Sequence, residues 1–343
     1  MNKYSPYKIF NFSDKLQAIK SDTITAPICV RIKPFNGCPH KCSFCVYNPE
    51  FAGMHELCNR TDMIPIGKML EILNDLHDMG VKSIILSGGG EPLMHPQTKR
   101  VLDRICEHGF EWAVITNGQQ VLKHVEYLQY AKWVRVSADY WDGDSFAKSR
   151  GLQNKKLNEI LDGIHILSET KCEVGINYII SQESYHGIFE AAAMFFAEGA
   201  SNIRYCPVWV DGLRDYHLSI YETAKQEIDR TIKMFDNHDF RVYDGYNLDF
   251  KDRRDYDSCV WQQIVPVIAA DQMVYRCHNT SYTPHGRLGS IQNRRFKDMW
   301  FSEDTKQNML SFDPSLSCSH QCSNENRNRL LNDFLDSSND SFV

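Results

Sequence analysis

The chain has 343 residues, of which 42 % are hydrophobic and 12 % aromatic, so it is not a disordered or low-complexity chain. Acidic residues outnumber basic ones by 44 to 38, and the formal net charge of −6 disfavours nonspecific binding to nucleic acid or to anionic lipid. Twelve cysteines are too few for a disulfide scaffold in a chain of this length.

The sequence shows no sign of export or of membrane insertion. Its first ten residues lack the apolar run of roughly 7–15 residues that a secretory signal needs. No stretch approaches the ~18 uninterrupted apolar residues of a membrane span, and even residues 188–200 contain Glu190 and Glu198. We therefore expect a cytoplasmic protein without membrane contact, in which clustered cysteines are metal ligands or catalytic thiols.

Strands and helices alternate from about residue 28 to residue 238. Short β-branched runs predict strands at residues 28–32, 81–86, 112–116, 133–137, 174–180 and 202–208. Apolar residues at helical spacing predict helices at residues 66–79, 96–108, 123–131, 155–168, 188–198 and 220–235. Six strand–helix units in strict alternation predict an α/β fold with a parallel sheet, curled or flat, and an active site at the carboxyl ends of its strands.

The pattern breaks after about residue 238. Residues 241–257 are polar, residues 265–269 and 273–275 predict a β-hairpin, and residues from 299 predict a helix followed by turns. The polar end of the chain is expected to fray. This predicts four parts: an N-terminal segment at 1–25, a barrel at 26–240, a C-terminal extension at 241–335 and a tail at 336–343.

Three cysteines follow the first predicted strand. Cys38, Cys42 and Cys45 form the pattern C-x3-C-x2-C, and three thiolates so close together can bind one face of an iron–sulfur cubane. One iron would then lack a protein ligand, and an open coordination position is what a catalytic metal needs. The alternative is a zinc site completed by His40 or by a distant cysteine.

A glycine-rich turn, Gly88-Gly89-Gly90-Glu91-Pro92, follows the second predicted strand. Such a turn can hold a phosphate on backbone N–H groups, but the carboxylate of Glu91 would repel phosphate and Pro92 lacks an N–H donor. A carboxylate suits an ammonium group instead. Taken alone, the motif fits an ordinary turn equally well.

Together, the two motifs resemble those of the radical S-adenosylmethionine (SAM) superfamily. The resemblance rests on C-x3-C-x-Phe-C at residues 38–45 and Gly-Gly-Glu at residues 89–91, in order within about residues 26–240. It implies a partial (β/α)6 barrel that holds a 4Fe-4S cluster and SAM. One electron passed into SAM then yields methionine and a 5′-deoxyadenosyl radical, which removes a hydrogen atom from the substrate.

The resemblance also implies roles for individual residues. The implied cluster ligands are Cys38, Cys42 and Cys45. The implied SAM-binding residues are Phe44 near the adenine and Gly89, Gly90 and Glu91 near the methionyl end. Weaker SAM-binding candidates lie in or at the ends of later strands, namely Asn117, Ser137, Asp139 and Asn177. Asn117 precedes Gly118, and an Asn-Gly pair indicates a β-turn as readily as a binding residue.

A second cysteine group lies in the predicted extension. Cys259, Cys277, Cys318 and Cys322 could form a closed site, and spacing alone leaves structural zinc and a fully ligated iron–sulfur cluster open. Next to a radical SAM barrel, the arrangement resembles the Twitch form of the SPASM extension. This resemblance implies a single auxiliary 4Fe-4S cluster.

Five cysteines remain, namely Cys29, Cys58, Cys106, Cys172 and Cys206. Free cysteine behaves as a small buried hydrophobe, and we expect this of Cys29, Cys106 and Cys172. Cys206 lies late in the sixth predicted strand, where its thiol could return a hydrogen atom to a substrate radical or could pack in the core. Further candidates for contact with substrate are Asp211, Arg214, Asp215, Tyr140 and Trp141.

For the reaction, we expect oxidation (dehydrogenation) or epimerisation of a small polar substrate such as a sugar, an aminocyclitol or a sugar nucleotide. Too few residues precede Cys38 for the leader-binding domain that peptide-modifying members of the family commonly carry, which disfavours a peptide. The alternatives are an enzyme that modifies a ribosomal peptide or a protein side chain, and a non-enzymatic iron–sulfur or zinc redox protein. A flavodoxin or ferredoxin is the expected electron donor.

Overall fold

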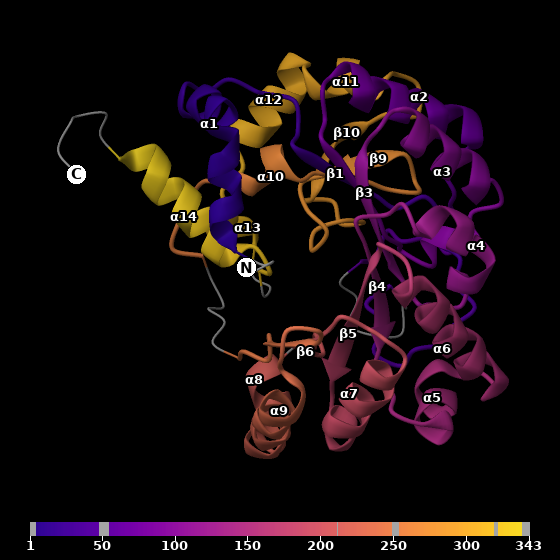
Figure 1. Ribbon diagram of the computed structural model, residues 1–343. Coiled ribbons are helices and arrows are strands. Elements are labelled where there is room, and N and C mark those ends of the chain that lie inside the picture. The colour runs from indigo at the N-terminus through magenta and orange to yellow at the C-terminus, as the bar shows by residue number, and fades with distance from the viewer. Residues whose placement is uncertain (1–4, 48–54, 211, 249–253, 319–321, 338–343) are drawn as a thin grey trace.

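The computed structural model describes residues 5–47, 55–210, 212–248, 254–318 and 322–337. In this part of the chain, ten strands form one sheet in the order β10-β9-β8-β1-β2-β3-β4-β5-β6-β7 (Figure 1). The strands are β1 (Cys29–Ile32), β2 (Ser83–Leu86), β3 (Glu111–Thr116), β4 (Trp133–Ala138), β5 (Glu173–Ile180), β6 (Asn202–Pro207), β7 (Arg241–Asp244), β8 (Val267–Ile268), β9 (Met273–Tyr275) and β10 (Arg287–Ser290). Neighbours from β1 to β7 are parallel, which confirms the predicted parallel α/β sheet.

Helices cover one face of the parallel part (Figure 1). They are α2 (Ile66–Asp78), α3 (Thr98–Glu107), α4 (Val121–Leu128), α5 (Gly143–Arg150), α6 (Lys155–Ser168), α7 (Ile188–Ala197), α8 (Leu213–Leu218) and α9 (Tyr221–Phe235), with short 3-10 turns at Pro92–Met94 and Tyr185–Gly187. Helix α2 shows why they dock: Met69, Ile72, Leu73 and Leu76 repeat at helical spacing, and all four are fully buried.

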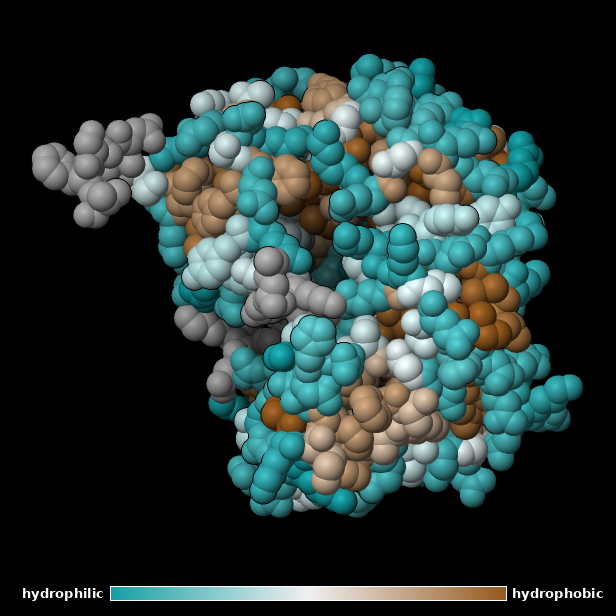
Figure 2. Space-filling view, in the orientation of Figure 1, coloured by the Kyte–Doolittle hydropathy of each residue, from teal (hydrophilic) through white to brown (hydrophobic). Residues whose placement is uncertain are grey.

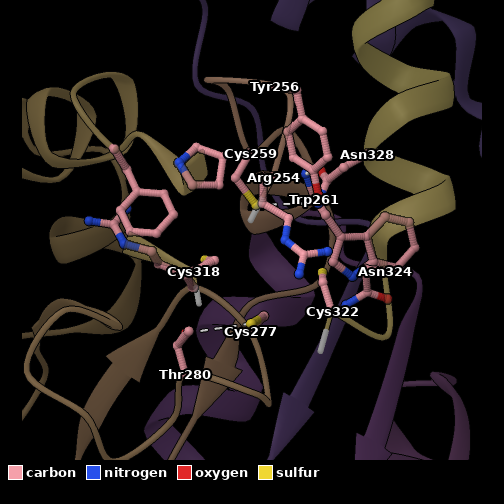
Figure 3. Close-up of a pocket in the computed structure, with 13 residues that line it drawn as sticks. Arg254, Tyr256, Cys259, Trp261, Cys277, Thr280, Cys318, Cys322, Asn324 and Asn328 are labelled. Atoms are coloured by element: carbon pink, nitrogen blue, oxygen red, sulfur yellow. Dashed lines mark hydrogen bonds between the residues drawn. The ribbon is translucent and has the colours of Figure 1, made fainter. Parts of the chain in front are cut away.

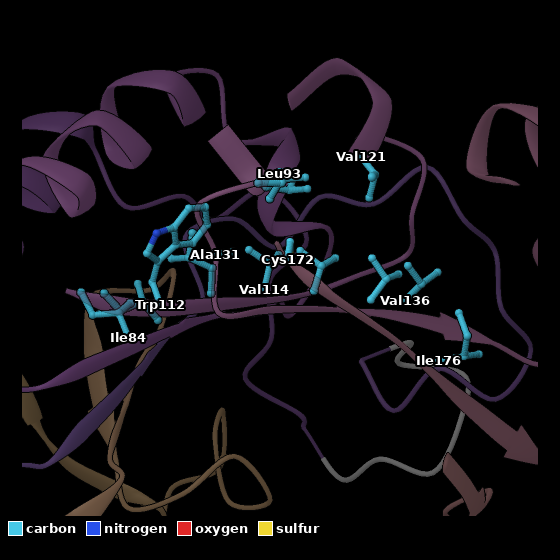
Figure 4. Close-up of a cluster of buried hydrophobic side chains, with 14 of the residues drawn as sticks. Ile84, Leu93, Trp112, Val114, Val121, Ala131, Val136, Cys172 and Ile176 are labelled. Carbon is cyan, nitrogen blue, oxygen red and sulfur yellow. The ribbon is translucent and has the colours of Figure 1, made fainter. Parts of the chain in front are cut away.

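The core lies between these helices and alternate residues of the strands. Ile84, Val114, Val136 and Ile176 project from four adjacent strands toward side chains such as Leu93 (Figure 4). Successive strand residues point to opposite faces, so the remaining residues of β1–β7 lie on the other, helix-free face. A functional site can therefore lie on that face or at the carboxyl ends of the strands.

The C-terminal extension joins the same sheet. The predicted hairpin is confirmed, because β8 and β9 are antiparallel, and β8 also pairs in parallel with β1. The extension's other elements are α10 (Trp261–Ile264), α11 (Phe296–Trp300), α12 (Glu303–Leu310) and α13 (Pro314–Ser317). The predicted domain boundary near residue 240 stays a prediction.

Two elements correct the sequence analysis. The chain does not leave the sheet at residue 238, because β7 adds a seventh parallel strand; only its Val242 is buried, so the segment has no apolar pattern to reveal it. The polar end of the predicted extension, for which no helix was expected, forms α14 (Glu325–Asp336), which buries Leu331. The tail expected to fray was 336–343: Asp336 is the last residue of α14 and Ser337 caps that helix, whereas 338–343 lie outside the described residues.

Helix α14 lies beside the N-terminal segment (Figure 1). The 3-10 helix Pro6–Phe12 and α1 (Ser13–Lys20) contribute Ile9 and Leu16 to a small cluster that also holds Leu331. Both ends of the described chain therefore pack together. No helix in the described ranges is long and apolar enough to cross a membrane.

The spare cysteines divide between core and surface. Cys172 is buried, as predicted, and Cys29 is partly buried. Cys106 is exposed, which contradicts the prediction, because α3 turns Val101, Leu102 and Ile105 toward the core and Cys106 toward solvent.

Candidate active site

The cysteine loop follows β1 at the carboxyl ends of the parallel strands. Cys38, Cys42 and Cys45 are each partly exposed, and a 3.2 Å hydrogen bond from the Cys45 N–H to the Cys42 carbonyl closes a turn between the last two. Thiolates are the protein ligands of iron–sulfur clusters. The described residues contain no ready-made group of three Cys, His, Asp or Glu side chains for a metal ion. The loop is therefore a candidate cluster site on its donor chemistry and its position.

A cation that the sequence analysis missed lies against this loop. Arg150 is the last residue of α5, a helix that starts at an Asp142–Ser145 capping box and stops at Gly151, whose φ is +65°. The Arg150 guanidinium donates a 2.8 Å hydrogen bond from Nη1 to Cys42 Sγ. Only the fold could reveal this contact, because 108 residues separate its two partners.

Arg150 also connects the cysteine loop to the end of β4. Its Nη2 donates to the Ser137 carbonyl at 3.1 Å, and its guanidinium pairs with the Asp139 carboxylate, both side chains being almost fully buried. Burial raises the pKa of Asp139, and Arg150 opposes that shift. The Phe44 ring lies 5.8 Å from the guanidinium. Asp139, expected to contact SAM, thus serves first as the counter-ion of Arg150.

The glycine loop after β2 lies directly against the cysteine loop. The Glu91 N–H donates to the Gly37 carbonyl at 2.9 Å. A Cβ at Gly90 would lie 2.2 Å from the Asn36 carbonyl oxygen, and one at Gly89 would lie 2.3 Å from Asn36 Oδ1. Both positions need glycine because the two loops approach closely.

Glu91 is held by three donors. Its carboxylate accepts hydrogen bonds from the Leu93 N–H at 3.1 Å, the Thr116 hydroxyl at 2.8 Å and the Asn117 N–H at 2.7 Å. The side chain is buried, and burial raises its pKa to about 7 against the effect of these donors. Glu91 therefore braces the ends of β2 and β3, and one of its oxygens accepts only from Asn117.

The remaining candidates at the carboxyl ends of the strands are Asn117, Ser137, Asn177 and Cys206, which lie in or next to neighbouring strands of the sheet. The Asn117 side chain donates to Cys38 Sγ at 3.6 Å, which connects the end of β3 to the cysteine loop. Asn177 pairs in register with Ser137, and its Oδ1 lies 3.7 Å from the thiol of Cys206. Burial raises the pKa of Cys206, so this thiol stays protonated and could donate a hydrogen atom.

Tyr282 is a second residue that the sequence analysis missed. It adopts a left-handed φ of +61°, is fully buried, and donates from its hydroxyl to Asn36 Oδ1 at 2.5 Å. Its ring centroid lies 5.0 Å from the ammonium of the buried Lys33, and burial lowers the pKa of that lysine to about 7. Tyr282 therefore connects the C-terminal extension to the loop that precedes Cys38.

The four cysteines of the extension line one pocket (Figure 3). Cys259 precedes α10, Cys277 follows β9, Cys318 follows α13 and Cys322 precedes α14. The fold thus brings together all four cysteines that the sequence analysis grouped. The same pocket contains Arg254 and Arg276, which no motif indicated.

The thiols in this pocket act on one another electrostatically. Burial, and to a smaller extent the neighbouring thiols, raise the pKa of Cys259 to about 12 and of Cys322 to about 11. Asn328 donates to Cys259 Sγ at 3.5 Å, and Cys277 Sγ lies 3.4 Å from the Thr280 hydroxyl. A bound cation or cluster would lower these pKa values, because it stabilises thiolates.

The remaining candidates are dispersed. Arg214 and Asp215 lie in α8, while Asp211 lies outside the described residues. Tyr140 is fully buried with its ring 5.0 Å from that of Phe146, so it packs in the core.

Comparison with known families and proteins points to one family. Residues 32–193 match the model of the Radical SAM superfamily. The chain is 26 % identical to GTP 3′,8-cyclase of Staphylococcus aureus over 157 residues, which are 45 % of this chain and 46 % of that enzyme. The match therefore spans less than half of the curated relative's length.

Solved structures share the fold over most of the chain. SuiB of Streptococcus suis, bound to precursor peptide SuiA, aligns over 91 % of this chain and 73 % of its own, with a TM-score of 0.61 and 17 % identity. The protein anSMEcpe, with bound AdoMet and Kp18Cys peptide, aligns over 88 % of both chains, with a TM-score of 0.61 and 17 % identity. These similarities establish the fold.

Proposed function

Because the chain carries a radical SAM domain at residues 32–193, we propose that it is an enzyme that abstracts a hydrogen atom from a peptide or protein side chain. A bound 4Fe-4S cluster and SAM would supply the 5′-deoxyadenosyl radical for this step. The observation that carries the proposal is the 2.9 Å hydrogen bond from Glu91 to Gly37, which joins the glycine loop to the cysteine loop at the strand ends.

The chain's own residues have distinct roles in this proposal. Cys38, Cys42 and Cys45 bind the cluster, and Arg150 compensates the negative charge of the Cys42 thiolate. Glycines 89 and 90 let the glycine loop lie directly against Asn36 and the cysteine loop, and the methionyl end of SAM would bind along this glycine loop. The partly exposed cysteine loop allows a flavodoxin or a ferredoxin to deliver the electron.

We also propose that the C-terminal pocket binds one auxiliary 4Fe-4S cluster. Four buried or partly buried thiols supply four ligands, and Arg276 lies beside them as a cation. Arg254 also lines the pocket, where it pairs with Glu325. A zinc ion would need the same four thiolates but would carry no electrons. An auxiliary cluster could accept the electron that remains after hydrogen abstraction and deprotonation, which yields an oxidised product.

The comparisons support a peptide over the sugar that the sequence analysis favoured. SuiB and anSMEcpe align with most of this chain and were solved with peptides bound. The curated relative is named for a nucleotide, and its match covers less than half of either chain. Oxidation and epimerisation are both compatible with a peptide substrate.

Cleavage of SAM tests the proposal. After anaerobic reconstitution, we expect the wild-type protein to form 5′-deoxyadenosine, and Cys42→Ala to fall to background. Cys106→Ala is the matched control, because Cys106 is exposed on α3, and its rate should stay within about twofold of wild type. Cleavage retained in Cys42→Ala would refute the proposed cluster ligation.

The substrate needs its own test. Deuterated peptides and deuterated sugar nucleotides are incubated in parallel with the reconstituted enzyme and SAM. We expect deuterium to enter 5′-deoxyadenosine from a peptide. Transfer from a sugar nucleotide alone would contradict the peptide assignment and leave the radical chemistry intact.

A further inference from the structure

Arg276 is a buried cation beside the four cysteines of the C-terminal pocket. Hydrophilic residues cover most of the face of the molecule that Figure 2 shows, where water screens their charges. Arg276 is instead only 4 % exposed, directly precedes Cys277 and lines the pocket that all four cysteines share. Burial lowers its pKa to about 10, against the effect of Cys259, Cys318 and Cys277, so its guanidinium stays charged at neutral pH.

Neutral groups hold this guanidinium in place. Its Nε donates to the His285 carbonyl at 3.2 Å, its Nη1 donates to Gln262 Oε1 at 2.5 Å, and its Nη2 donates to Asn308 Oδ1. The guanidinium carbon lies 4.0 Å from the centre of the Phe312 ring. None of these partners is a carboxylate, so none of them neutralises the charge of Arg276.

The two amide acceptors are themselves oriented by the fold. In α10, Gln262 donates from Nε2 to the Met309 carbonyl at 2.9 Å. In α12, Asn308 donates from Nδ2 to the Arg287 carbonyl at 3.1 Å. Each amide nitrogen thus has a carbonyl to donate to, which turns each amide oxygen toward Arg276. The guanidinium is therefore fixed between β9, α10 and α12, and its charge stays at the pocket.

The charge of Arg276 fits an anionic group in this pocket. A second arginine there, Arg254, is paired with the Glu325 carboxylate and so has its own counter-ion. A buried charge without a counter-ion costs free energy. Thiolates that bind a cluster would supply the negative charge that the neutral partners of Arg276 lack.

We propose that Arg276 raises the reduction potential of the auxiliary cluster, so that this cluster can accept an electron from the substrate radical. This inference rests on the proposed auxiliary cluster and deepens it by assigning the residue that sets how readily the cluster is reduced. Once the 5′-deoxyadenosyl radical has taken a hydrogen atom and a proton has left to solvent, the substrate radical gives one electron to the oxidised cluster and becomes the oxidised product. The cluster thereby gains one negative charge. A fixed cation stabilises this reduced state, because the potential of a cluster depends on the charges and hydrogen bonds around it.

The reduction potential is measured on protein that holds the auxiliary cluster alone. Combining Cys38→Ala, Cys42→Ala and Cys45→Ala removes the ligands of the other cluster, and about four iron atoms per chain should remain after anaerobic reconstitution. Electron paramagnetic resonance then follows the reduced auxiliary cluster during a redox titration. This readout needs neither SAM cleavage nor a substrate.

Three substitutions in this background separate charge from structure. At the potential that reduces half of the cluster in the parent protein, Arg276→Gln should lower the ratio of reduced to oxidised cluster at least tenfold, which is a midpoint lower by about 59 mV or more. Arg276→Lys keeps the charge and should lower the ratio by less than about threefold. Arg294→Gln is the matched control, because it removes the same charge from an exposed side chain of the extension, and it should change the ratio by less than about twofold.

Gln262→Glu tests the same charge without removing the arginine. It places a carboxylate against Nη1 of Arg276 and should also lower the midpoint, so it replaces Arg276→Gln if that variant fails to bind iron. An unchanged midpoint in iron-loaded Arg276→Gln or Gln262→Glu would overturn the inference. Equal shifts in Arg276→Gln and Arg276→Lys would do the same, since they would reveal a structural role. A folded protein without the cysteine-loop ligands that binds no iron would instead refute the auxiliary cluster of the proposed function.

Discussion

Arg150 and Asp139 are an almost fully buried ion pair that also contacts Cys42, so each partner depends on the other. Arg150→Gln leaves the Asp139 carboxylate buried without a counter-ion, and we expect a loss of roughly 3–5 kcal/mol in the free energy of unfolding. Adding Asp139→Asn should recover a large part of it, because the uncompensated charge is removed. Urea unfolding measures both, with Arg230→Gln as an exposed control. A loss below about 1 kcal/mol in Arg150→Gln would contradict the assigned role.

The raised pKa of Glu91 predicts how the free energy of unfolding depends on pH. Burial raises its pKa from 4.5 to about 7 in the folded protein. Between these values the folded state binds a proton that the unfolded chain has released, so the free energy of unfolding decreases as pH rises from about 4.5 to about 7. The difference is on the order of 3 kcal/mol. Glu91→Gln should lose this slope in urea titrations, and Glu107→Gln, exposed on α3, should keep it.

Cys206 distinguishes two ways of completing the reaction. In an oxidation the remaining electron leaves through the auxiliary cluster, so Cys206→Ala should keep both 5′-deoxyadenosine formation and product within about twofold of wild type. In an epimerisation the thiol returns a hydrogen atom, and solvent deuterium enters the product. We expect the first result, measured by mass spectrometry in deuterated water. Normal hydrogen abstraction with loss of product would instead assign Cys206 as the hydrogen donor.

At the scale of elements, the glycine loop and the cysteine loop are in close contact, and we expect a substitution at Gly90 to disturb this contact. Its built Cβ lies 2.2 Å from a backbone oxygen that cannot move away freely, so Gly90→Ala should cost roughly 1–3 kcal/mol or more and weaken SAM binding at least tenfold. Gly67 in α2 is the matched control, since its Cβ would meet open space. Gly67→Ala should stabilise the protein by about 0.5–1 kcal/mol. Equal effects of the two substitutions would show that loop contact is unimportant.

The segment from Cys277 to Tyr282 connects the two cysteine groups. It begins at the C-terminal pocket and ends with the Tyr282 hydroxyl on Asn36, the residue that limits space at Gly89 and Gly90. A left-handed backbone at a tyrosine costs free energy, which is consistent with a constrained functional position. This segment therefore joins the C-terminal pocket to the residue that lies against the glycine loop.

For the whole molecule, the number of clusters decides how the extension functions. Two 4Fe-4S clusters predict about eight iron atoms per chain after anaerobic reconstitution. Cys318→Ala should lower this to about four without abolishing SAM cleavage, because the cysteine loop is unchanged. Iron and zinc are measured together by mass spectrometry. About four iron atoms with one zinc in the wild type would contradict the auxiliary cluster.

Much of the fold could be predicted from local patterns. The six strands and six helices between residues 28 and 235 appear where apolar periodicity indicates them, because each pattern depends on near neighbours. Strand β7 and helices α5, α8 and α14 were missed, since each buries too few apolar residues to produce a pattern. Cys106 was misassigned because the face that a helix turns to the core depends on what it packs against.

The sequence by itself determined the parallel α/β fold, the cysteine and glycine motifs that resemble those of the radical SAM superfamily, and the grouping of four C-terminal cysteines. Only the tertiary structure decided that Arg150 meets Cys42 and that Tyr282 meets Asn36. The partners in these two contacts are 108 and 246 residues apart. Contacts over such separations form only when the sheet is assembled, so no local spacing encodes them.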